Sequence, residues 1–239
     1  MPAGASTGGL VVLVPGGGWQ TADPTGLEPL ARGLAGDGYA AATVTYRAAA
    51  VGAHYPVPVA DILCGAASAV AQARARGHPA TRLILLGHSA GGQLALLAAL
   101  HPQGFRSPCA DPAVTPDAVV TLAGAFDLRD IAEPLFGLPQ QAGPDLWHQG
   151  DVVTWATERP SMPVLLLHGS ADTLVPPHVT QDVAAALRAA GHPTYVEVLP
   201  DVDHTSIYRP KVILPVLLSW LARQTATRNQ SAGAASGSS

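Results

Sequence analysis

The chain has 239 residues, of which 48% are hydrophobic and only 13% carry a charged side chain, and its formal net charge at pH 7 is -4. This length and hydrophobic content suffice for one domain with a sizeable core. The low charge content excludes a basic surface that would follow a nucleic-acid backbone, and an acidic tract that would stay unfolded. We therefore expect a single domain that binds no nucleic acid.

Neither end of the sequence indicates a membrane protein. The most hydrophobic late segment, residues 212–221, is too short to cross a bilayer and is interrupted by Pro215. Residues 1–9 lack the basic start and apolar middle of a secretion signal, which favours a cytoplasmic protein, although a processed secreted form would look the same. The two cysteines, Cys64 and Cys109, fit no zinc motif; we expect free thiols, with one disulfide as the open alternative.

Short apolar runs alternate along the chain with alanine-rich segments of helical spacing. This alternation is typical of a parallel β-sheet covered by helices on both faces. Six strands are predicted, at residues 10–14, 41–46, 82–86, 118–122, 164–168 and 195–199. Helices are predicted at residues 26–36, 59–76, 91–100, 177–190 and 211–223.

The predicted α/β domain covers residues 10–224, between an N-terminal extension at residues 1–9 and a disordered tail at residues 225–239. Residues 128–162, which we call the lid-like region, show no strand signal. A connection of this length commonly shapes a binding pocket. We expect it to lie over the ends of the strands.

A strand, a sharp turn and a helix are predicted in succession around Ser89. The turn reads Gly87-His88-Ser89-Ala90-Gly91, a G-x-S-x-G pattern in which a strained turn exposes the serine as a nucleophile. Glycines flank the serine because such a turn leaves little room for side chains. Taken alone, the pattern fits a nucleophile and an ordinary serine in a glycine-rich turn about equally well. The rest of the sequence must distinguish these two interpretations.

A serine hydroxyl is a weak nucleophile, and it needs a base that an acid holds in the correct tautomer. Asp172 follows the predicted strand at residues 164–168, and His204 follows the last strand. The chain order Ser89, Asp172, His204 is that of an α/β-hydrolase triad. Asp127, after the fourth strand, competes with Asp172 for the role of the acid, but Asp172 lies in the better turn.

The sequence resembles the α/β-hydrolases, in particular the small esterases and lipases related to hormone-sensitive lipase and the kynurenine-formamidase-like enzymes. The resemblance covers nearly all of residues 10–223 and rests on segments 15–19, 87–92, 168–176 and 203–204. It implies a serine hydrolase that needs no cofactor. Such relatives begin with two further strands, whereas only nine residues precede the first strand here. We therefore expect the second strand to lie at a sheet edge, where a homodimer could form.

The segment Pro15-Gly16-Gly17-Gly18-Trp19 is predicted to form an oxyanion hole, because acyl transfer needs N–H groups aimed at the developing negative charge. Gly17 and Gly18 are the expected donors, and the resemblance adds the N–H of Ala90. Relatives usually carry histidine in place of Pro15. A phosphate-binding loop is the alternative, but the lysine and hydroxyl residue that such a loop requires do not follow.

The other histidines and acids near these motifs are interpreted as structural. His88 neighbours the nucleophile but should point elsewhere, and His168 is expected to brace a loop. Asp201 and Asp203 are close to His204 in sequence, but such neighbours rarely contact the ring side-on. Of the nine histidines, none forms H-E-x-x-H or another close ligand pair, so no metal site is predicted.

Four aromatic residues are candidates for substrate binding, although core packing explains each almost as well: Trp19, Phe126, Trp147 and Trp155. Without a large cap, the expected substrate is a small-molecule ester with a short or medium acyl chain, or a bulky exposed ester, unless the lid-like region covers the site. The open alternatives are an amidase, formamidase or acyltransferase with the same triad, and a non-catalytic binding protein on this fold.

Overall fold

The computed structural model describes residues 8–105, 109–129 and 131–236. Its centre is a six-stranded sheet in the order β2-β1-β3-β4-β5-β6, in which every neighbouring pair is parallel. The predicted fold class, a single α/β domain, is thereby confirmed. The strands are β1 (Gly9–Val14), β2 (Ala40–Thr43), β3 (Arg82–His88), β4 (Ala118–Leu122), β5 (Val164–Gly169) and β6 (Thr194–Leu199).

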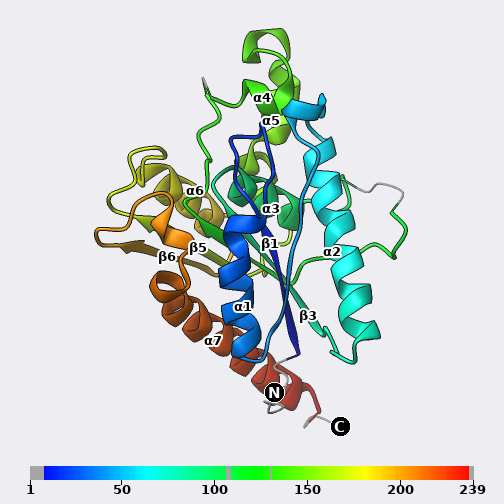
Figure 1. The fold of residues 1–239 in the computed structure, drawn as a ribbon. Helices are drawn as coiled ribbons and strands as arrows, with labels where there is room; N and C mark the ends of the chain where they lie inside the picture. Colours follow the sequence, from blue (N-terminus) through cyan, green and yellow to red (C-terminus); the bar gives the residue numbers. More distant parts are fainter. Residues whose placement is uncertain (1–7, 106–108, 130, 237–239) are drawn as a thin grey trace.

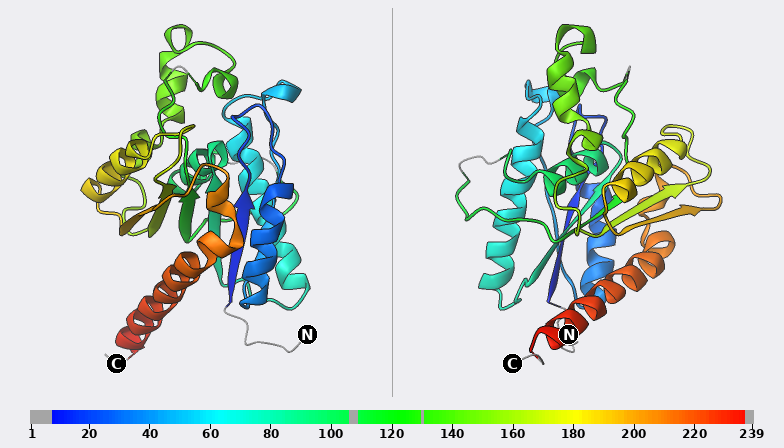
Figure 2. Two further views of the ribbon diagram at one scale, coloured as in Figure 1. Left: turned by 60° about the vertical axis from the view of Figure 1, so that its left-hand side comes forward. Right: turned by 180° about the vertical axis from the view of Figure 1, so that it is seen from behind.

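Helices cover both faces of the sheet, as the apolar runs predict (Figures 1 and 2). Alternate side chains of β1 belong to two different cores, because successive residues of a strand point to opposite faces. One core contains α2 (Val57–Ala75), α3 (Ala90–Leu100) and α6 (His178–Ala189). The other contains α1 (Glu28–Gly36) and α7 (Pro210–Ser236). The strands are therefore buried on both sides.

Helix α7 is longer than predicted. It begins one residue before the predicted start and continues to Ser236, so the tail predicted to be disordered overlaps the helix at residues 225–236. Residues 237–239 and 1–7 lie outside the described residues, and with them most of the predicted N-terminal extension. Of the helices in the described part of the chain, none combines the length and apolar character that a membrane span requires.

Strand β2 lies at one edge of the sheet, which confirms the predicted edge position. It ends at Thr43, three residues before the predicted end, because the chain then turns toward the loop after β1. The hydroxyl of Thr45 donates to the carbonyl of Ala22, and that of Tyr46 donates to the carbonyl of Pro15. Among the described strands, none pairs with the outer side of β2.

The expectation of free thiols is wrong, because Cys64 and Cys109 form a disulfide. Cys64 lies on α2, whereas Cys109 lies in the connection between α3 and β4. The disulfide therefore joins α2 to the segment that leads into β4. Cys109 lies 45 positions after Cys64 along the chain, so their pairing depends on tertiary structure that no local pattern encodes.

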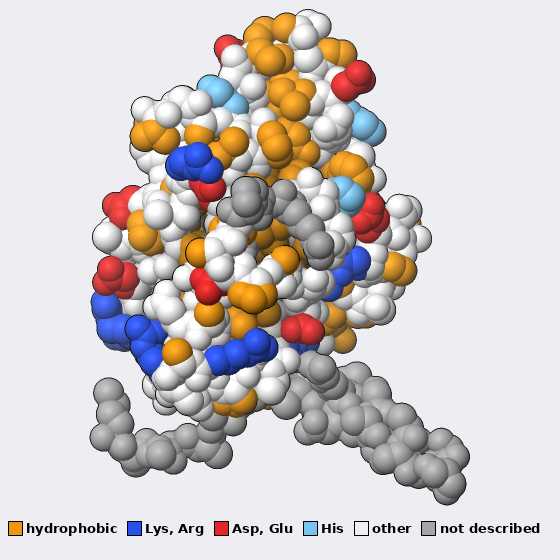
Figure 3. Space-filling model, turned by 90° about the vertical axis from the view of Figure 1, so that its right-hand side faces the viewer, with side chains coloured by type: hydrophobic (Ala, Val, Ile, Leu, Met, Phe, Trp, Pro, Cys, Tyr) orange, Lys and Arg blue, Asp and Glu red, His pale blue; other side chains and the backbone are white. Residues whose placement is uncertain are grey.

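The lid-like region lies beyond the carboxyl ends of the strands (Figure 2). Its described residues form α4 (Glu133–Phe136), η3 (Gln140–Ala142), α5 (Pro144–Gly150) and η4 (Val152–Trp155), and none of them forms a strand. Gln93 of α3 donates to the carbonyl of Gly150 at 2.7 Å, and Tyr55 donates to that of Gln149 at 3.0 Å. These bonds attach the region to the domain. Apolar side chains gather on this upper part of the molecule in Figure 3.

Candidate active site

Ser89 occupies a strained turn between β3 and α3. Its φ of 53° and ψ of -124° lie in a region that residues with a side chain rarely adopt. A Cβ at Gly87 would overlap the backbone oxygen of Gly91, and one at Gly91 would overlap that of Pro15. Only glycine therefore fits on either side of the serine, which explains the sequence pattern.

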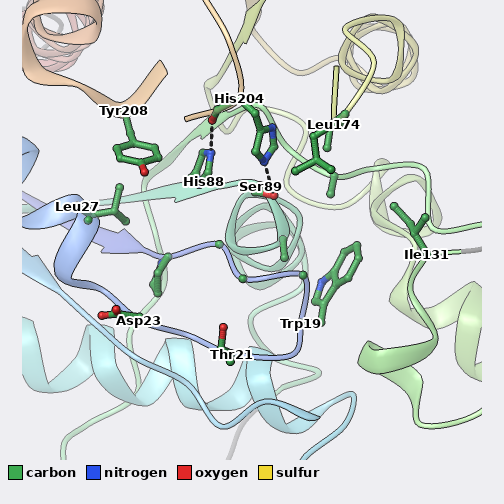
Figure 4. A pocket seen from close by; sticks show the side chains of 18 residues that line it. Trp19, Thr21, Asp23, Leu27, His88, Ser89, Ile131, Leu174, His204 and Tyr208 are labelled. Atoms are coloured by element: carbon green, nitrogen blue, oxygen red, sulfur yellow. Dashed lines mark hydrogen bonds between the residues drawn. The ribbon is translucent and has the colours of Figure 1, made fainter. Parts of the chain in front are cut away.

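The three residues of the predicted triad converge at the carboxyl ends of β3, β5 and β6. His204 Nε2 lies 2.9 Å from Ser89 Oγ (Figure 4). His204 Nδ1 lies 2.7 Å from Asp172 Oδ2. A carboxylate only accepts hydrogen bonds, so Nδ1 carries the proton and Nε2 accepts from the serine hydroxyl. All three residues are buried. The arrangement leaves the imidazole poised to take the proton of Ser89.

Asp172 is held as a carboxylate by its hydrogen bonds. Oδ1 accepts from the N–H groups of Leu174 and Val175, each at 2.9 Å. Burial opposes ionisation most strongly, but the bonds from Val175, His204 and Leu174 together outweigh it and lower the pKa of Asp172. An ionised acid in this position stabilises the imidazolium that forms when His204 takes a proton.

The competing acids have other partners. Asp127 forms an ion pair with Arg129 at 2.7 Å, and it is Asp172 that contacts His204. Asp203 accepts the backbone N–H groups of Thr205 and Ser206 in the turn beside His204. These bonds, that of Ser206 first, lower the pKa of Asp203 to about 2. Asp203 thus shapes the turn and leaves the orientation of the ring to Asp172.

His88 contacts the turn that carries His204. Its Nε2 lies 2.8 Å from the backbone oxygen of His204, so it donates to that carbonyl, and the centres of the two rings are 4.8 Å apart. Burial, followed by the proximity of His204, lowers the pKa of His88 to about 4. The ring is therefore neutral at pH 7, and its contact is with the backbone of the candidate base.

The glycine segment after β1 passes close to Ser89. A Cβ at Gly16 would lie 2.9 Å from the Cβ of Ser89. The N–H groups of Gln20 and Thr21 donate to the carbonyl of Gly17 and fold the segment into a turn. Among the backbone hydrogen bonds of the described residues outside helices and strands, none has the N–H of the predicted donors Gly17, Gly18 or Ala90 as its donor. They therefore stay the candidate donors for an oxyanion.

Gly17 and Gly18 offer a matched pair of substitutions. A Cβ at Gly17, where φ is +132°, would overlap the backbone of Thr21, whereas at Gly18, where φ is +58°, it would meet nothing within 4 Å. We expect Gly17→Ala to displace the donors and lower kcat/KM for an activated ester by about a hundred- to a thousandfold. Gly18→Ala, which adds only the strain of a left-handed alanine, serves as the control. Equal losses in two equally folded variants would contradict this assignment of the loop.

A cavity of about 570 Å³ opens at Ser89 and His204. Leu27 and Tyr208 line it on one side of the serine, and Leu174 and Ile131 line it on the other (Figure 4). Sequence reasoning missed all four. Leu174 and Tyr208 are each within four residues of a triad member, which is a usable signal. Leu27 and Ile131 carry no comparable signal, because distant segments bring them to the site.

Of the four aromatic candidates, the structure brings Trp19 to the cavity, where its indole N–H donates to Gln93 at 3.2 Å. The other three lie outside the lining of this cavity. Phe126 is buried in the core. Trp147 stacks on Phe136 at a centroid distance of 4.4 Å, and Trp155 stacks on His101 at 3.8 Å. Packing thus accounts for these three side chains.

Solved structures of esterases share the fold. The chain superposes on esterase 2 of Thermogutta terrifontis with bound propionate (TM-score 0.73, 22% identity, 93% of this chain and 85% of that one). That esterase is also known phosphonylated by sarin (TM-score 0.70, 21% identity, 93% and 86%). A truncated carbohydrate esterase from gut microbiota matches with a TM-score of 0.76 at 16% identity (95% and 88%). A bifunctional GH43-CE protein of Bacteroides eggerthii matches with a TM-score of 0.71 at 20% identity, and there the chain covers 90% of its own length but only 34% of the other protein.

Sequence comparison identifies the family. No curated protein matches the chain. The profile of the family described as BD-FAE matches residues 1–187, a span that includes Ser89 and Asp172 but ends before His204. Because this match covers most of the chain, the protein belongs to the BD-FAE family, and its fold is the α/β-hydrolase fold that the sequence resemblance implies.

Proposed function

We propose that this protein is a serine carboxylesterase that forms an acyl-enzyme intermediate. The observation that carries the proposal is the continuous hydrogen-bonded line from Asp172 through His204 to Ser89, with contacts of 2.7 and 2.9 Å. It meets the cavity beside the predicted oxyanion donors. Nucleophile, base, orienting acid and oxyanion donors are the parts that acyl transfer requires.

The proposed reaction has two halves. Ser89 Oγ attacks the ester carbonyl while His204 Nε2 takes its proton, and the N–H groups of Gly17, Gly18 and Ala90 bind the oxyanion. His204 then gives this proton to the leaving alcohol as the ester bond breaks. In the second half, His204 takes a proton from water, which attacks the acyl-enzyme, and the acid leaves as Ser89 regains its proton. No cofactor takes part in this scheme.

The walls of the cavity support a small-molecule ester as the substrate. Leu174 is 71% exposed and Ile131 is 51% exposed beside the nucleophile, so apolar surface is available to a group larger than the cavity itself. We propose a short or medium acyl chain, or a bulky ester that extends over this rim. The propionate bound to the Thermogutta terrifontis esterase, and the carbohydrate esterase among the similar structures, are consistent with this range.

A series of p-nitrophenyl esters from acetate to decanoate, combined with labelling by a fluorophosphonate, tests the proposal. We expect stoichiometric labelling and the highest kcat/KM for acyl chains at the short end of the series. A matched amide and an added alcohol acceptor separate the esterase from an amidase, a formamidase or an acyltransferase. A folded protein that neither reacts with the fluorophosphonate nor turns over any ester would instead be a binding protein.

The cellular location and the oligomeric state stay predictions. Disulfides persist mainly in oxidising compartments, so the bond between Cys64 and Cys109 counts against the cytoplasm and fits a processed secreted form. The homodimer is predicted at the outer edge of β2. A groove of about 580 Å³ runs along this edge between β2 and α2, which supports the edge as a contact surface.

A further inference from the structure

A second histidine, His168, approaches the same carboxylate oxygen of Asp172 that His204 contacts. His168 lies at the end of β5 and is 0% exposed. Its Nε2 is 3.2 Å from Asp172 Oδ2 and 2.9 Å from the backbone oxygen of Val175. Its Nδ1 is 2.7 Å from the hydroxyl of Thr180, which is also 0% exposed and belongs to α6. The reaction scheme above uses neither residue.

The partners of His168 determine its tautomer. Both groups near Nε2, a carboxylate and a carbonyl, only accept hydrogen bonds, so Nε2 carries a proton. Burial is the largest influence on His168 and lowers its pKa. The ring is therefore neutral at pH 7, and its unprotonated Nδ1 accepts from the hydroxyl of Thr180.

These assignments join five side chains into one line of polar contacts: Thr180, His168, Asp172, His204 and Ser89. We propose that His168 and Thr180 are positioning residues of the active site, which fix Asp172 and limit how much of its negative charge acts on His204. This proposal rests on the proposed function only in so far as it treats Ser89, His204 and Asp172 as catalytic.

Two histidines lie beside Asp172 Oδ2. This oxygen accepts from His204 at 2.7 Å and lies 3.2 Å from His168 Nε2, while Oδ1 accepts from two backbone N–H groups. Each donor disperses part of the carboxylate charge, and hydrogen bonds in a chain strengthen one another. A weaker donor at His168 leaves more charge facing His204, and this stabilises the imidazolium. Thr180, on a helix that does not line the cavity, thus influences how strongly Asp172 stabilises protonated His204.

The ionisable groups around this line are few. Asp172 and His204 act on His168, and His88 acts on His204 from the other side. His88 is neutral at pH 7, as is His168. Neither of these two rings adds a charge beside Asp172 at pH 7, so a change in the charge distribution of Asp172 should be visible in the titration of His204.

Thr180→Val and Thr180→Ser test the proposal, because valine has the shape of threonine without the hydroxyl and serine keeps the hydroxyl. The measurement is the NMR titration of His204 in the resting protein with isotope-labelled histidine. In Thr180→Val we expect the midpoint to move to higher pH by about half a unit, and Thr180→Ser to titrate like the unmodified protein. The acid limb of kcat/KM should move with it, at unchanged KM.

His168→Gln and His168→Leu form the second pair, because the amide of glutamine can donate from near the position of Nε2 and leucine cannot. We expect kcat per active site, counted with an organophosphonate, to fall about tenfold or more in His168→Leu and to recover in His168→Gln. A titration of His204 that is unchanged in folded Thr180→Val would overturn the positioning role even in an active esterase. A shifted titration in a protein without esterase activity would keep that role and reject the proposed function.

Discussion

Replacing Ser89 by alanine is expected to lower kcat for an activated ester by about a millionfold, the scale seen when the nucleophile of a serine hydrolase is removed. The hydroxyl is the atom that His204 contacts at 2.9 Å, and no other hydroxyl occupies that position in the described cavity lining. Labelling by a fluorophosphonate should disappear together with turnover. Both are measured on purified protein.

The fold of the Ser89→Ala variant should be unchanged, which makes the loss interpretable. The turn is held by backbone bonds, since Ser89 N–H donates to Leu122 and the Ser89 carbonyl accepts from Gly92, Gln93 and Ala125. Circular dichroism and the Tm provide the control. Turnover near that of the unmodified enzyme would end the proposed mechanism.

Replacing Asp172 by asparagine is expected to lower kcat by about ten-thousandfold, as when the orienting acid of a triad loses its charge. The N–H groups of Leu174 and Val175 would keep the amide oxygen on their side. The amide NH₂ would then face His204 and force its proton onto Nε2, where it blocks the acceptance of the Ser89 proton. Steady-state kinetics with the same ester measure the loss.

Asp127→Asn is the matched control for this prediction. Asp127 was the rival acid in the sequence, and its carboxylate pairs with Arg129 at the surface. Surface ion pairs contribute little to stability, so we expect kcat within about twofold of the unmodified enzyme. If Asp127→Asn lost as much activity as Asp172→Asn, the acid would be misassigned.

The sequence predicts the sheet and the convergence of the triad for one physical reason. Parallel strands end at the same edge, so residues that follow β3, β5 and β6 are brought together wherever the intervening helices lie. Strand boundaries agree to within one residue except at β2 and β3. Strand β3 continues two residues beyond its predicted end, to His88. Strand β2 ends early because Thr45 and Tyr46 bond to the loop after β1 and leave the sheet.

The features that the sequence did not predict all depend on packing between distant segments. The pairing of Cys64 with Cys109 needs the connection after α3 to return to α2. Trp147 and Trp155 were assigned to the pocket by residue type, whereas neighbouring rings account for their positions. The sequence predicted His168 only as a residue that braces a loop. Its contacts with Asp172 and with Thr180 could not be predicted, because Thr180 lies on the following helix.

The glycines packed around Ser89 tolerate no side chain, whereas the residues at the rim of the site can be replaced. Gly16 lies against Ser89, Gly91 against Pro15, and Gly87 against Gly91, so backbone atoms occupy the space that any new side chain would need. These positions are closed to diversification. Leu174 and Ile131 extend from the rim with most or half of their surface free. We therefore expect that substitutions at the rim can change which substrates bind, while the glycine-packed turn around Ser89 stays unchanged.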